Sequence, residues 1–62
     1  MKLYVAYIAQ GGERSRQIAG RTIIEDCSMP TNEDAIKLIE DTIERRTDAD
    51  IAIITFMYQL ND

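Results

Sequence analysis

Few side chains in this 62-residue chain are suited to catalysis, and histidine is absent from the sequence. General acid–base catalysis and nucleophilic triads most often use histidine, so the single thiol, Cys27, lacks its usual activating base. We therefore interpret Cys27 as a small residue at the end of a strand. With one cysteine and no histidine, a zinc site of the usual ligand type cannot be assembled. The sequence thus predicts a protein that is not an enzyme and holds no cofactor or metal.

Three arginines close to a glycine pair are the next candidates for a site. Gly11 and Gly12 open a polar segment that contains Arg14 and Arg16, and Arg21 follows a few residues later. Guanidinium groups bind phosphates and carboxylates through paired hydrogen bonds, so Arg14, Arg16 and Arg21 are candidates for gripping a small ligand or nucleotide. The segment lacks the lysine and the following helix of a phosphate-binding P-loop. A hairpin tip with solubilising charges is the simpler interpretation.

Acidic residues form a third group, in the segment that the pattern below predicts to be helical. A stripe of carboxylates can engage a basic groove on another protein and steer association, and Glu40, Asp41 and Glu44 are the candidates for that contact. Basic residues interrupt the stripe, so ordinary surface charge is the simpler interpretation. Three carboxylates on one helix face also converge poorly on a cation.

The elements that position these groups follow the order ββαβ. Two segments rich in Tyr, Val and Ile precede a segment with helical periodicity, and a third apolar segment follows. Thr31 is the expected N-cap, with Asp34 three residues on. The strands are predicted at 2–10, 17–27 and 51–59. The apolar face of the helix is predicted to contain Ala35, Ile36, Leu38, Ile39, Thr42 and Ile43.

We expect these elements to form one α+β domain over residues 1–62. A right-handed crossover places the last strand beside the first, which gives an antiparallel sheet of order 2-1-3 with the helix on one face. If Gln10 opposes Gln17, Leu3 and Val5 lie under the helix and Tyr4 points away from it. In the last strand, the expected inward residues are Ile54, Phe56, Tyr58 and Leu60, and the expected outward residues are Ile51, Ile53, Thr55 and Met57.

Both faces of the strands are apolar, although one helix can cover only one of them. Antiparallel sheets with one wet face normally alternate between apolar and polar residues. We therefore predict that a second copy of the chain covers the other face or pairs with an exposed strand edge. The alternative is a mildly apolar face that stays wet around Arg21 and Glu25. The expected dimer interface consists of Tyr4, Ile8, Ile23, Ile51, Ile53 and Met57.

Size and charge agree with self-association. A chain this short buries only about 60% of its unfolded surface, and small folds commonly gain stability from a partner chain. The net charge of −4 argues against direct binding to nucleic acid or to an anionic membrane. We expect a cytoplasmic protein, because the apolar start has no signal-peptide features and the lone thiol fits a reducing compartment.

The apolar segments 3–8 and 51–54, together with Gly20 and Pro30, resemble small ββαβ proteins encoded by phages and prophages. The resemblance covers most of the chain as a pattern of apolar positions and includes Gly20 and Pro30. Some phage proteins of this size block bacterial immune systems, and the inhibitor of the Hachiman defence is a small homodimeric example. The resemblance implies a non-enzymatic inhibitor that binds a host defence protein.

Overall fold

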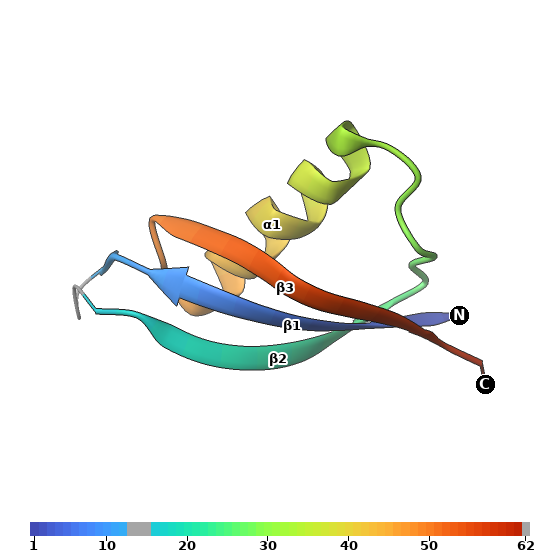
Figure 1. The fold of residues 1–62 in the computed structure, drawn as a ribbon, viewed down its shortest axis with the longest axis horizontal. Helices are drawn as coiled ribbons and strands as arrows, with labels where there is room; N and C mark the ends of the chain where they lie inside the picture. The colour runs from blue at the N-terminus through green and yellow to red at the C-terminus, as the bar shows by residue number, and fades with distance from the viewer. Residues whose placement is uncertain (13–15, 62) are drawn as a thin grey trace.

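The computed structural model shows a three-stranded antiparallel sheet with one helix across one side (Figure 1). The structure describes residues 1–12 and 16–61. The sheet order is β2-β1-β3, so the predicted α+β class, ββαβ order and strand arrangement are confirmed. We call the side of the sheet under the helix the inner face and the opposite side the outer face. The elements are β1 (Lys2–Gln10), β2 (Ile18–Glu25), α1 (Glu33–Thr47) and β3 (Ile51–Leu60).

The pairing of β1 with β2 has the predicted register. Tyr4 lies opposite Ile23, and Val5 lies opposite Thr22. Because side chains alternate along a strand, Leu3 and Val5 share the inner face, where both are fully buried. Tyr4 consequently points to the outer face.

A β-bulge in β3 changes the alternation that the sequence led us to expect. Ala6 pairs with Phe56, but its neighbour Tyr7 pairs with Ile54, so Thr55 is an extra residue on β3. A bulge of this kind shifts every later side chain to the opposite face. The prediction that Ile54 faces inward is therefore correct, but the same prediction for Phe56, Tyr58 and Leu60 is wrong. Met57, which was expected on the outer face, lies on the inner face. The outward residues after the bulge are Phe56, Tyr58 and Leu60.

The core lies between α1 and the inner face. Ile39 and Ile43 lie one helical turn apart and pack against buried residues of β1 and β3. Leu38, expected on the packed face, is instead 68% exposed. It lies about 100° around the helix from Ile39, outside the contact with the sheet. The buried core residues are Leu3, Val5, Ala9, Ile39, Ile43 and Ala52.

Both ends of α1 are fixed by identifiable hydrogen bonds. Asn32 is the N-cap, because its side-chain oxygen accepts the N–H of Ala35 at 2.9 Å, so the prediction of Thr31 was wrong. At the other end, Arg46 donates from Nη1 to the hydroxyl of Thr22 at 3.0 Å and to the carbonyl of Ile23 at 3.2 Å. The last turn of the helix is thereby tied to β2.

Candidate interaction surface

The outer face is the largest apolar surface that the described part of the chain leaves uncovered. On its β1–β3 side, Ile53, Phe56 and Tyr58 are 54%, 55% and 58% exposed. Ile23 of β2 is also exposed. The rings of Tyr4 and Phe56 meet edge to face with centroids 6.4 Å apart, an arrangement that adds to the stability of a packed aromatic pair. The face therefore presents ordered aromatic and aliphatic side chains to solvent.

The area of this surface is large for a monomer. The accessible surface of the protein is 4637 Å², whereas the scaling of surface with mass gives about 4,100 Å² for a folded monomer of 7.1 kDa. Five side chains on the outer face are about half exposed and contribute roughly 500–600 Å² together. They are Ile23, Ile51, Ile53, Phe56 and Tyr58. Apolar patches of this size on a monomer usually mark a binding surface.

Most of the residues expected at a dimer interface share this face. Tyr4, Ile8 and Ile23 occupy positions on β1 and β2 that turn outward, and Ile51 and Ile53 precede the bulge on β3. Met57 does not belong to the set, because it packs against the core cluster beneath α1. Phe56 and Tyr58 occupy the outer face of β3 where Met57 was expected. Their exposure depends on the bulge, for which the sequence of β3 offers no distinct signal.

The charged residues of the outer face lie on β2 and at the start of β1. Arg21 pairs across the sheet with Ala6, and Glu25 pairs with Lys2. The ten residues of β3 include no ionisable acid or base other than Tyr58. The outer face thus has an apolar region over β1 and β3 and a charged margin along β2 that includes Lys2 at the start of β1. This is the division between core and rim found in protein interfaces.

The arginines do not gather into one site. Arg21 is on the outer face, whereas Arg16 lines a cavity on the helix side of the sheet. Arg14 lies outside the described residues. Arg16 and Arg21 therefore cannot bind the same ligand within one protomer.

The glycine pair serves the fold. Gly11 and Gly12 have φ angles of 98° and 73°, and a side chain on either would clash with the turn between α1 and β3. The N–H of Gly12 donates to the carboxylate of Asp50 at 3.3 Å. The N–H of Asp50 in turn donates to the carbonyl of Gln10 at 3.1 Å. In a phosphate-binding loop, the backbone N–H groups point at the ligand. Here the N–H of Gly12 is already bonded to the carboxylate of Asp50, so the loop is attached to the turn before β3.

The acidic candidates on α1 separate into two kinds. Glu44 is partly buried, and its carboxylate accepts the N–H of Ala52 at 3.0 Å. This bond connects the helix to the start of β3, a role that the sequence did not reveal. Asp41 is exposed and Glu40 is partly exposed, so these two remain available to a partner. Within residues 1–12 and 16–61, no three Cys, Asp or Glu side chains are placed to hold a metal ion.

Cys27 follows β2 and packs against the core cluster. Its thiol is directed to the carbonyl oxygen of Ser28 at 3.5 Å, a weak contact. This environment fits the interpretation of Cys27 as a packing residue at the end of a strand. In the described part of the chain, no helix has the length and apolar character needed to cross a membrane.

No family model, curated protein or solved structure matches this chain. Function is therefore inferred from the geometry of the surfaces described above. Among these, the outer face has the largest apolar area and the clearest division into centre and margin.

Proposed function

We propose that the protein is a non-enzymatic protein-interaction module that forms a homodimer by packing two outer faces together. The observation that supports this most is the half-exposed apolar surface of Ile53, Phe56 and Tyr58 beside the ordered Tyr4–Phe56 pair. Sheets stack face to face about 10 Å apart with interdigitated side chains, and these residues have the size that such a layer requires.

The available area and charge also suit a second copy as the occupant. A standard interface buries about 800 Å² per partner, which the apolar centre and charged margin of the outer face together can approach. A two-fold interface brings the same patch together twice. Arg21 and Glu25 have opposite charges and lie on the same face of β2, four residues apart in the sequence. In a two-fold dimer, Arg21 of one copy can therefore meet Glu25 of the other.

The resemblance to small phage proteins gives this proposal a biological setting. In that setting, the dimer binds and inhibits a bacterial defence protein in the cytoplasm, a compartment that also suits the free thiol of Cys27. Packing through the outer faces leaves both helices exposed. Asp41 and Glu40 would then approach a basic surface of the target, which the net charge of −4 favours.

Light scattering coupled to gel filtration tests the dimer. We expect twice the 7.1 kDa mass of one chain at micromolar concentration. Phe56→Glu should give a folded monomer, because the new charge would be buried in the interface without a partner. Leu38→Glu is the matched control, since Leu38 is an apolar residue on the helix that is at least as exposed as Phe56. A monomeric wild-type protein, or a dimer that only Leu38→Glu disrupts, would refute the proposed interface.

A phage plating assay tests the inhibitory role. Expression of the chain in bacteria that carry the Hachiman system should restore plating of a restricted phage. The double variant Glu40→Lys/Asp41→Lys should lose this effect while remaining a dimer, whereas Glu44 is left unchanged because it supports the fold. Full restriction in the presence of the wild-type chain would reject inhibition of that system.

A further inference from the structure

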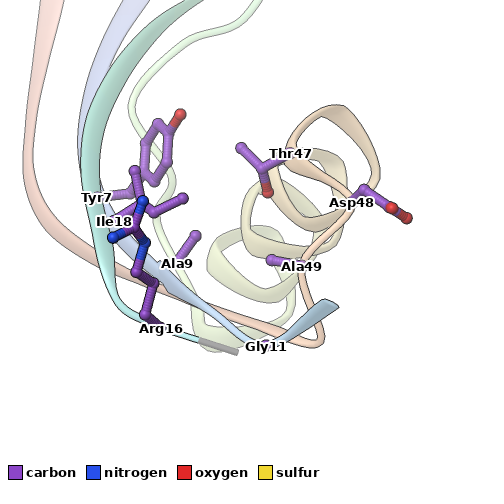
Figure 2. Close-up of a pocket in the computed structure, with 8 residues that line it drawn as sticks. All are labelled: Tyr7, Ala9, Gly11, Arg16, Ile18, Thr47, Asp48 and Ala49. Carbon is purple, nitrogen blue, oxygen red and sulfur yellow. The ribbon is translucent and has the colours of Figure 1, made fainter. Parts of the chain in front are cut away.

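A cavity of about 340 Å³ lies on the helix side of the sheet, next to the C-terminal end of α1. Its volume falls within the range of small-molecule sites. Figure 2 shows Tyr7 and Arg16 on the strand side of the cavity and Thr47 and Ala49 on the helix side. The remaining lining residues are Ala9, Gly11, Ile18 and Asp48.

The strand side offers two polar groups, the hydroxyl of Tyr7 and the guanidinium of Arg16. Among the described residues, neither the hydroxyl of Tyr7 nor the guanidinium of Arg16 has a hydrogen-bond partner. By contrast, the hydroxyl of Thr47 donates to the carbonyl of Ile43 at 2.7 Å. The side chain of Asp48 points away from the other lining residues (Figure 2). Within residues 1–12 and 16–61, the guanidinium of Arg16 is therefore unpaired and lies beside apolar side chains.

Gly20 fixes the position of the aromatic wall. Tyr7 lies opposite Gly20 across β1 and β2, and a Cβ at Gly20 would come within 2.6 Å of the Tyr7 hydroxyl. The ring therefore lies across the backbone of β2 where only glycine leaves room for it. The close approach at Gly20 is thus made by a side chain of the neighbouring strand.

We propose that this cavity binds a small amphipathic anion, with its carboxylate or phosphate on Arg16 and its short apolar part against Tyr7 and Ile18. The C-terminal end of a helix carries partial negative charge, so the anionic group is directed away from it to Arg16, and the apolar part lies along Tyr7 and Ile18. This site is separate from the proposed dimer interface, because Tyr7 and Ile18 face inward while the interface uses the outer face.

Amide chemical shifts measured during titration with four probes test the site. Hexanoate, hexyl phosphate, hexylammonium and hexanol have the same tail and differ only in the head group. We expect hexanoate or hexyl phosphate to shift the amides of Tyr7, Ala9, Thr47 and Ala49, and the stronger of the two identifies the preferred anion. Hexylammonium should bind at least tenfold more weakly, because it would meet the charge of Arg16.

Two arginine variants provide a matched comparison. Arg16→Gln should weaken anion binding about tenfold, since a charge-assisted hydrogen bond is replaced by a neutral one. Arg21→Gln should leave affinity unchanged, because Arg21 lies on the opposite face. Ala49→Leu should also reduce binding by filling the cavity while both arginines remain. The light-scattering mass should stay the same for Arg16→Gln, which separates this site from the dimer.

Three results would overturn the site. Shifts of equal size with hexylammonium and the anions would show that charge is not recognised. Equal losses from Arg16→Gln and Arg21→Gln would show a general effect of net charge. The absence of shifts at the four amides with every probe at millimolar concentration would show that the cavity binds none of these groups.

Discussion

The two faces of the sheet are similar in composition and opposite in environment. On the inner face, Leu3 and Val5 are fully buried beneath α1. On the outer face, Ile53 and Tyr58 are more than half exposed, although they are just as apolar. The comparison teaches that the protomer uses one face of its sheet for folding and leaves the other face able to drive association. Burial of apolar area contributes about 25 cal/mol per Å² in either case.

The largest expected effect comes from the inner face. Ile43→Ala removes a buried side chain and should lower the free energy of unfolding by about 2–5 kcal/mol, because a cavity remains in a small core. Urea unfolding at a fixed protein concentration measures this change. Leu38→Ala on the same helix should change the value by less than about 0.5 kcal/mol. Similar losses from the two variants would contradict the assignment of the helix face.

A comparison of adjacent residues tests the two faces more sharply. Met57→Glu should lower the stability of the protomer by about 2–3 kcal/mol, because it places a charge among core residues. Phe56→Glu should act mainly on association. In wild type, each tenfold rise in concentration should stabilise the dimer by about 1.4 kcal/mol, and Phe56→Glu should abolish that dependence. If the two variants behaved in the opposite way, the bulge would be misplaced.

The attachment of the helix to the inner face should depend on Glu44. Replacement with Gln keeps the size of the side chain but removes the charge of the acceptor for the N–H of Ala52. We expect a loss of about 1–2 kcal/mol in thermal or urea unfolding, since hydrogen bonds to charged groups are the stronger ones. Asp41→Asn, a matched change on the exposed side of the helix, should have little effect. Equal effects would contradict a structural role for Glu44.

The smallest expected effect is at the start of the helix. Asn32→Ala should cost about 1 kcal/mol, because the N–H of Ala35 loses its side-chain acceptor. Thr31→Ala should be nearly neutral, since Thr31 precedes the cap. Denaturation monitored by circular dichroism distinguishes the two variants. A larger loss of stability from Thr31→Ala than from Asn32→Ala would indicate that Thr31 is the N-cap, as the sequence suggested.

The features predicted correctly from sequence depend on regular repeats. The assumed pairing of Gln10 with Gln17, extended along the alternating strands, predicted the register that opposes Tyr4 and Ile23. Helical spacing identified Ile39 and Ile43 as core residues. The order of the strands followed from the handedness of the crossover. These inferences succeed because each depends on a pattern repeated over several residues.

The features that were missed depend on single residues or on tertiary contacts. Threonine is common in regular strands, so Thr55 does not indicate a bulge. Phe56 and Met57 were consequently assigned to the wrong faces. The bond from Ala52 to Glu44 depends on the turn between helix and strand, which periodicity does not describe. The cavity beside Arg16 likewise exists only once the helix end and β2 are brought together.

The bulge also bears on how this surface can change during evolution. Loss of the Thr55 codon would restore continuous parity along β3 without altering any other residue. The aromatic side chains beyond that point would keep their place on the outer face, because Ile54 and Phe56 already lie on opposite faces. If Thr55 instead paired regularly with β1, the same side chains would be directed at the helix, and Met57 and Gln59 would be presented in their place. Loss of the bulge residue thus preserves the recognition surface, whereas its incorporation into the regular pairing would replace that surface over half of the strand.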